Sequence, residues 1–212
     1  MPRHYLFDLD GTLVDTITLY GEAVLKVLSE MGIEETWEHF REWYSTPVHA
    51  EQILRMHGKD PATTLTGFRE RREEIYIGML REKTVWLPGA QELLKELTAA
   101  PLGIVTTSWQ SYVDAIDDCL GIKKHFKVIV TCDMAEPLTK PHPHPLFLAA
   151  DALSVDPKDC VYIGDQRFDV DAAKAAGMEA WLVTGEWTPK NITGADRVFG
   201  SLEEVAHVIQ PC

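Results

Sequence analysis

Two carboxylates, two positions apart, end the first apolar segment of the chain. Asp8 and Asp10 follow the apolar residues 5–7, and Gly11 and Thr12 after them predict a tight turn. A buried strand seldom ends in charged side chains unless a cation or a reaction compensates the charge. In an open α/β sheet, ligands bind at the carboxyl ends of the strands. The string Asp-x-Asp-Gly-Thr therefore indicates a reactive or cation-binding strand end rather than an ordinary polar turn.

Further polar side chains occupy comparable places later in the chain, and they are Thr106, Thr107, Ser108, Lys140, Asp165 and Asp169. The hydroxyls follow the apolar residues 103–105, where a hydroxyl taken alone is more often a helix N-cap than a catalyst. Lys140 opens a proline-rich stretch ahead of a helix, a setting in which a single lysine is ordinarily solvated. Asp165 and Asp169 stand at a helix start, and their i, i+4 spacing can direct both carboxylates toward one point.

Taken in order, these residues resemble the four motifs of the haloacid dehalogenase superfamily. Its members are mostly magnesium-dependent phosphohydrolases that act through a phosphorylated aspartate. Residues 8–16 are similar to the first motif, Thr106 to the second, Lys140 to the third, and residues 164–169 to the fourth. The resemblance spans essentially the whole chain, and the complete ordered set favours a functional interpretation of each member.

The resemblance implies a role in phosphoryl transfer for each motif residue. Asp8 would attack phosphorus, while Asp10 would protonate the leaving oxygen and then deprotonate the water that hydrolyses the aspartyl-phosphate. Thr106 and Lys140 would complete the catalytic set by binding the phosphoryl oxygens as charge shifts during transfer. The substrate-binding residues that we expect are Thr12, Thr107, Ser108 and again Lys140.

Magnesium is the cofactor that the resemblance implies. Asp8, Asp10, Asp165 and Asp169 are four acids expected at strand ends, where they would repel one another without a cation. Hard oxygen ligands and a phosphate partner favour Mg²⁺ over Zn²⁺. We expect Asp8, the main-chain carbonyl of Asp10 and Asp165 to bind the ion directly. Asp169 is expected to act through a water molecule or to orient Lys140.

Two sequence patterns predict the elements that position these residues. Over residues 16–84 the apolar residues recur at helical spacing and no strand is expected. From residue 87 onward, short apolar strands alternate with helices, which predicts a parallel sheet with right-handed crossovers. We therefore expect an α/β fold with a Rossmann-like three-layer core, formed by residues 1–15 and 85–212. An all-helical cap domain would be inserted at residues 16–84.

Composition limits the partners that this chain can have. A formal net charge of −13 argues against nucleic acid and anionic membranes, but not against an anionic substrate at a locally positive site. No apolar run approaches the roughly 20 residues that span a bilayer, and no signal peptide is recognised. The four isolated cysteines indicate reduced thiols. We therefore expect a cytoplasmic protein, a monomer or a weak homodimer, that acts on a small phosphorylated substrate.

The helical insert is similar to the small-cap subgroup that includes phosphoglycolate phosphatase-like enzymes and β-phosphoglucomutase. A phosphatase for a small phosphorylated metabolite is the expected function, with a mutase, a pyrophosphatase, a nucleotide hydrolase and a catalytically silent binding module as alternatives. A dehalogenase is disfavoured because it needs neither Asp10 nor Mg²⁺. The chain has Thr16-Ile17 where phosphoglycolate phosphatases usually carry Pro-Asp, and Thr107-Ser108 where they commonly carry Asn-Lys. No individual substrate is therefore predicted.

The insert is also expected to act as a lid that gives specificity. Arg41, Ser45 and Thr46 would contact the leaving group, while Trp37 and Phe40 would hold the helices together. Pro47 is expected to open the next helix. An ordinary interhelical turn is the alternative for this segment.

Overall fold

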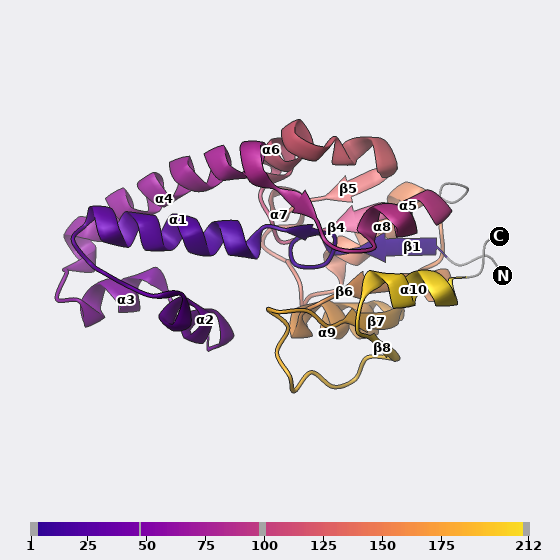
Figure 1. Ribbon diagram of the computed structural model, residues 1–212. Helices are drawn as coiled ribbons and strands as arrows, with labels where there is room; N and C mark the ends of the chain where they lie inside the picture. Colours follow the sequence, from indigo (N-terminus) through magenta and orange to yellow (C-terminus); the bar gives the residue numbers. More distant parts are fainter. Residues whose placement is uncertain (1–3, 47, 98–100, 210–212) are drawn as a thin grey trace.

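Figure 1 shows a computed structural model in which a sheet-containing core lies at one end and a group of helices at the other. The structure describes residues 4–46, 48–97 and 101–209, so the expectation for Pro47 lies outside the described residues. Within these ranges no helix has both the length and the apolar character needed to cross a bilayer.

The core is built on a six-stranded parallel sheet with the order β5-β4-β1-β6-β7-β8. Its strands are β1 (His4–Phe7), β4 (Gly103–Val105), β5 (Val128–Val130), β6 (Cys160–Gly164), β7 (Glu179–Val183) and β8 (Arg197–Phe199). Phe7 pairs with Ile104 on one side and with Ile163 on the other. The carboxyl ends of β4, β1 and β6 are therefore adjacent, which brings together the residues that follow them.

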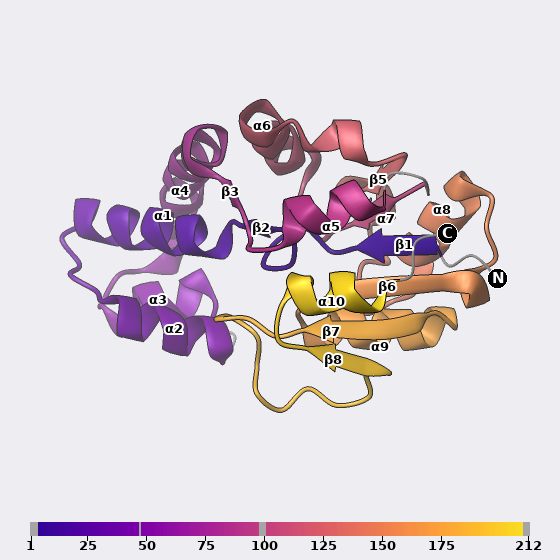
Figure 2. The same cartoon turned by 45° about the vertical axis from the view of Figure 1, so that its right-hand side comes forward.

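Helices cover both faces of this sheet, as the alternation of buried side chains requires. One face, with Phe7 and Ile163, packs against α5 (Ala90–Glu96), α6 (Gln110–Leu120) and α10 (Leu202–Val208). The other, with Leu6 and Tyr162, packs against α7 (Cys132–Ala135), α8 (His144–Leu153) and α9 (Arg167–Ala176). Figure 2 shows α5 and α10 side by side over one face. The expected three-layer α/β architecture is confirmed.

A helical segment lies between β1 and the rest of the core. It comprises α1 (Ile17–Glu30), α2 (Trp37–Ser45), α3 (Ala50–Met56) and α4 (Pro61–Lys83). Asp60 begins α4 by accepting a hydrogen bond from the Ala62 amide, next to a proline at the first helical position. Buried Leu28, Leu54 and Leu80 belong to the same apolar cluster as the core face that carries Phe7.

Two short strands connect the helical segment to the core. β2 (Val14–Asp15) and β3 (Val85–Trp86) form an antiparallel pair in which Val14 lies opposite Trp86. The sequence did not predict this pair, because two-residue strands carry no periodicity. Two short 3₁₀ turns, Ile122–His125 and Pro157–Asp159, complete the elements. The division into a core and a cap domain remains a prediction.

Local contacts and proline set the starts of two helices. α9 begins at Arg167, because the Asp169 carboxylate accepts a hydrogen bond from the main-chain N–H of Gln166 at 2.9 Å and so caps the first turn. α8 begins at His144, one residue before Pro145, which occupies a first-turn position where its missing amide hydrogen costs nothing.

Gly103 lets the central strands approach closely, and its replacement tests this packing. A Cβ at Gly103 would lie 2.6 Å from Leu6 and 2.8 Å from Val128. We expect Gly103→Ala to lower the free energy of unfolding by about 1–3 kcal/mol through overpacking. Gly67→Ala is the matched control, because a Cβ there meets open space and should stabilise α4 by up to about 1 kcal/mol. Urea unfolding of both variants checks the difference, and equal effects would contradict it.

Candidate active site

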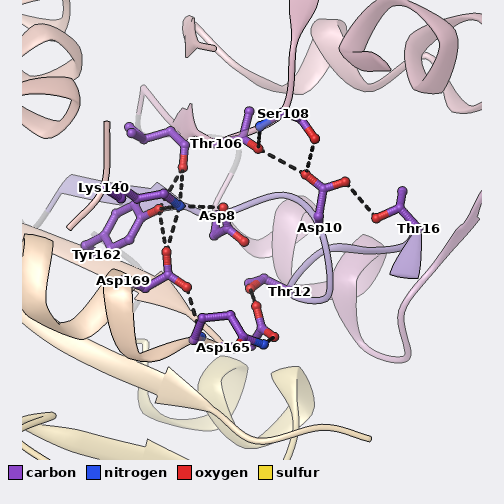
Figure 3. A network of polar contacts seen from close by, with 12 residues as sticks. Asp8, Asp10, Thr12, Thr16, Thr106, Ser108, Lys140, Tyr162, Asp165 and Asp169 are labelled. Carbon is purple, nitrogen blue, oxygen red and sulfur yellow. Dashed lines mark hydrogen bonds and ion pairs between the residues drawn. The ribbon is translucent and has the colours of Figure 1, made fainter. Parts of the chain in front are cut away.

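Three buried carboxylates meet where β1 and β6 end. Asp8 follows β1, Asp165 follows β6, and Asp169 lies in the first turn of α9. Each offers an oxygen within 4.8 Å of the others, and the residues are only 1–3% exposed. Figure 3 shows the three side chains directed toward one region. Such a cluster of like charges requires compensation by a cation.

The compensating cation from the protein is Lys140. Its Nζ lies 2.6 Å from Asp8 Oδ1 and 2.6 Å from Asp169 Oδ1, and its side chain is inaccessible to solvent. The ammonium also contacts the Tyr162 hydroxyl at 2.7 Å and the Val105 carbonyl at 3.0 Å. The Tyr162 hydroxyl in turn donates to the Val105 carbonyl at 2.7 Å. Lys140 is thus held by groups from β1, β4, β6 and α9.

One lysine does not balance the charge of this site. If all groups are ionised, three carboxylates at −1 and one ammonium at +1 leave a formal charge of −2. Burial raises the pKa of Asp8 well above its usual value, and Lys140 only partly opposes this. Burial and the neighbouring Asp169 carboxylate raise the pKa of Asp165 to about 7. Burial lowers the pKa of Lys140, but Asp169 and Asp8 outweigh it, so that the net shift is upward.

These residues fit a divalent metal ion. The ligand atoms are carboxylate oxygens, which hard cations prefer, and one divalent cation would balance the formal charge of −2. The Asp165 carboxylate is also held in place, because Thr12 Oγ1 donates to it at 2.9 Å and Gln166 Nε2 at 2.5 Å. Gly11 has φ +79°, and a Cβ there would lie 2.9 Å from the same carboxylate. Only glycine therefore suits this turn.

Asp10 is placed in different surroundings from Asp8. Its carboxylate accepts hydrogen bonds from Thr16 Oγ1 at 2.6 Å, Ser108 Oγ at 2.8 Å and Thr106 Oγ1 at 3.0 Å. Figure 3 shows this side chain turned away from the three clustered acids. The two carboxylates of this short turn therefore have different surroundings. Asp8 contacts the Lys140 ammonium and lies beside two further acids, whereas Asp10 accepts hydrogen bonds from three hydroxyls.

The structure gathers most of the expected site residues into these two networks. Asp8, Lys140, Asp165 and Asp169 form the first, which Thr12 joins through Asp165. Thr106 and Ser108 join Asp10 in the second, and Thr107 is exposed beside them.

Three further residues of the networks were missed by the sequence analysis. Tyr162 lies inside a buried strand, Thr16 ends the first motif and received no role, and Gln166 was not singled out. Gln166 follows Asp165 directly inside the fourth motif, so its position was the available signal. The contact between Thr16 and Asp10, six positions apart, depends on how the chain turns at Gly11.

The helical segment touches the core near this site. In the core loop after β7, the Trp187 ring lies 5.5 Å from that of Tyr44 and 5.8 Å from that of Phe40. Arg41 forms an ion pair with Glu186, and its guanidinium lies 5.5 Å from the Trp187 ring. The hydroxyls expected to face the substrate, Ser45 and Thr46, both donate to the Glu42 carbonyl and are exposed.

Comparison with known proteins identifies the family. The model of the family described as haloacid dehalogenase-like hydrolase matches residues 5–183. The chain belongs to this family. It is similar to a phosphoglycolate phosphatase of Yersinia pestis, with 30% identity over 82% of this chain and 78% of that protein. It is likewise similar to protein CbbY of Cereibacter sphaeroides, with 32% identity over 94% and 92% of the two chains.

A solved structure supports the same assignment. The crystal structure of CbbY from Rhodobacter sphaeroides in complex with phosphate superimposes with a TM-score of 0.79 at 26% identity, covering 97% of this chain and 96% of that chain. The expected superfamily and its phosphoglycolate phosphatase-like subgroup are confirmed. This haloacid dehalogenase-like hydrolase is a phosphatase, an enzyme that hydrolyses phosphoric esters.

The buried lysine can be tested through the stability of the protein without added divalent cations. We expect Lys140→Met to lower the free energy of unfolding by about 3–5 kcal/mol, because it leaves Asp8 and Asp169 buried without their partner. Lys174→Met is the matched control. Lys174 forms an ion pair with Asp196, and its side chain is exposed to solvent. Loss of this pair should lower the free energy of unfolding by at most about 1 kcal/mol. Urea unfolding at pH 7 measures both, and a small effect of Lys140→Met would contradict the interpretation.

Proposed function

We propose that this enzyme is a Mg²⁺-dependent phosphatase that releases phosphate from a small phosphorylated metabolite through an aspartyl-phosphate intermediate on Asp8. The observation that carries the proposal is the separation of Asp8 and Asp10 into two polar environments within one turn. Pairs of titratable groups with different surroundings can take different roles in catalysis. In this pair Asp8 is the nucleophile and Asp10 the general acid and base.

Asp8 suits nucleophilic attack because its position is fixed and its charge can be compensated. Lys140 contacts Oδ1, so we assign attack on phosphorus to Oδ2. The lysine orients the carboxylate and offers positive charge to the incoming phosphate. Attack forms the bond between Asp8 and phosphorus while the bond from phosphorus to the leaving oxygen breaks.

Asp10 suits proton transfer because three hydroxyls hold its carboxylate on the side that faces the helical segment. It protonates the leaving-group oxygen as the ester bond breaks, and it then takes a proton from the water that attacks the aspartyl-phosphate. Thr106 and Ser108 orient this carboxylate before substrate arrives. We propose that Thr106, with Thr12, Thr107 and Ser108, also donates to the bound substrate.

The metal ligands in this proposal are Asp8, Asp165 and the main-chain carbonyl of Asp10. Bound Mg²⁺ supplies positive charge that neutralises the site and the transferring phosphoryl group. Asp169 acts through Lys140, in keeping with the 2.6 Å contact between them. The Thr12 and Gln166 side chains keep the Asp165 carboxylate oriented toward the ion.

The proposal also covers the domain organisation, the cellular compartment, the oligomeric state and the partners of the protein. Residues 1–15 and 85–212 form the core domain that carries the chemistry, and residues 16–84 form the cap. The protein acts in the cytoplasm as a monomer or weak homodimer and uses neither nucleic acid nor membranes as partners. Its net charge of −13 and the free thiols of Cys119, Cys132 and Cys160 support this setting.

Phosphate release tests the nucleophile and the metal together. We expect Asp8→Asn to lower the rate by roughly 10⁴-fold or more, because the amide cannot form the covalent intermediate. Chelation with EDTA should abolish the activity of the unaltered enzyme, and added Mg²⁺ should restore it. Asp171→Asn is the matched control, since Asp171 is an exposed acid on α9 outside both networks. Full activity of Asp8→Asn, or full activity in EDTA, would overturn the assignment, and transfer to a sugar hydroxyl in place of water would identify a mutase.

The role of Asp10 is tested by the dependence of rate on the leaving group. An activated aryl ester needs little protonation of its leaving oxygen, whereas an alkyl ester depends on it. We therefore expect Asp10→Asn to slow aspartyl-phosphate formation by about 10²–10⁴-fold for alkyl esters, and by much less for activated aryl esters. Single-turnover kinetics on both ester types measure the difference. An equal defect on both would assign Asp10 another role.

A further inference from the structure

The helical segment contains a cavity of about 240 Å³ among its four helices. The aromatic side chains that line it are Tyr20, Phe40, Trp43, Tyr44 and Phe68. The other lining side chains are aliphatic except for His49, and no lysine, arginine or carboxylate lines the cavity among the residues that the structure describes. We call this space the aromatic cap cavity. Its lining differs sharply from the charged networks that surround Asp8 and Asp10.

One wall of the aromatic cap cavity is linked to the clustered acids. The Tyr44 ring contacts the Trp187 ring at 5.5 Å, and Gln166 Nε2 donates to the Trp187 carbonyl at 3.4 Å. The same amide donates to Asp165 at 2.5 Å. Burial raises the pKa of Tyr44 above its usual value, and the nearby carboxylates of Asp165 and Asp10 add to this shift.

A second wall is linked to Asp10. The Tyr20 ring packs edge-on against that of Tyr76 at 5.4 Å, and burial together with the nearby Asp10 carboxylate raises the pKa of Tyr76. Tyr20 and Tyr44 therefore line the cavity and also contact residues that lie beside Asp10 and Asp165.

We propose that the aromatic cap cavity is a subsite for the leaving group of the substrate, and that this leaving group is an uncharged, largely apolar alcohol. The inference rests on the proposed phosphatase function. A charged group would lose its hydration in this cavity without gaining a counter-charge from the lining. An aromatic or branched aliphatic group would bury its surface against five aromatic side chains.

The size of the cavity limits the length of that group. At about 30 Å³ for each water-sized atom, 240 Å³ has room for about eight such atoms, which is the size of a phenyl ring with a short stem. The arginines near the cavity do not line it. Arg41 pairs with Glu186, and Arg72, whose buried Nε has no hydrogen-bond partner, donates through Nη1 to the Tyr20 hydroxyl at 3.0 Å. The uncharged lining favours a neutral occupant.

Three alkyl phosphates with leaving groups of similar basicity test the subsite in the Mg²⁺-loaded enzyme. They are 2-phenylethyl phosphate, ethyl phosphate and 3-carboxypropyl phosphate. We expect kcat/KM for the phenylethyl ester to exceed that for each of the others by about 100-fold. Equal values for the phenylethyl and ethyl esters, or a preference for the carboxylated ester, would overturn the subsite while leaving the phosphatase proposal intact.

Substitutions that fill the cavity test whether the leaving group binds there. Ala50→Trp and Val48→Phe each place bulk at a lining position, and we expect each to lower the ratio of kcat/KM between phenylethyl and ethyl esters by at least about tenfold. Ala62→Trp, at an exposed position of α4, is the matched control and should leave the ratio unchanged. An unchanged ratio in a folded cavity variant would overturn the proposal.

Binding of the product alcohol tests the subsite without requiring catalysis. Calorimetry with 2-phenylethanol should detect binding to the unaltered protein, and binding at least about tenfold weaker in the cavity variants. If no ester is hydrolysed, the phosphatase proposal fails, and this measurement still decides whether the cavity binds an apolar group. Absence of binding to the unaltered protein would overturn the subsite.

Discussion

The buried ammonium of Lys140 is the interaction on which the rest of the site depends. It joins Asp8 after β1, Asp169 on α9, Tyr162 on β6 and the carbonyl of Val105 on β4. These groups are far apart in the sequence, and without the lysine the buried carboxylates of Asp8 and Asp169 would lose their counter-charge. The carboxyl ends of three neighbouring strands are thereby held in one arrangement. The strand order brings these groups together, and the lysine sets part of the electrostatics of the site.

The lysine leaves part of the acidic charge uncompensated, and this remainder has a chemical use. A site without net charge would attract a divalent cation only weakly, and it would also attract a phosphate bound to that cation only weakly. Burial keeps water from screening the remaining charge, which is why the pKa values of Asp8 and Asp165 are raised. Asp10, two residues after Asp8, accepts hydrogen bonds from three hydroxyls instead. A single turn thus supplies two carboxylates with different partners.

The sequence predicted the parts of this site that lie at strand ends and follow a motif. Asp8, Asp165 and Asp169 could be found because charged residues after apolar runs are conspicuous, and Lys140 because its surroundings resemble the third motif of the family. Tyr162 could not, since a tyrosine in a buried strand gives no sign of where its hydroxyl points. Trp187 lies in a loop, and its contact with Tyr44 joins residues more than a hundred positions apart. Likewise, no local pattern encodes a cavity among four helices, because its walls come from separate elements.

The paired strands β2 and β3 have a mechanical consequence. The chain leaves the core and returns to it side by side, and the hydrogen-bonded ladder makes the two crossings one strap. The first and last residues of the helical insert are therefore held close together, so that the insert begins and ends at the same place on the core. Outside this strap the insert also contacts the core, because the Tyr112 hydroxyl on α6 donates to Glu73 on α4 and the rings of Trp187 and Tyr44 lie 5.5 Å apart.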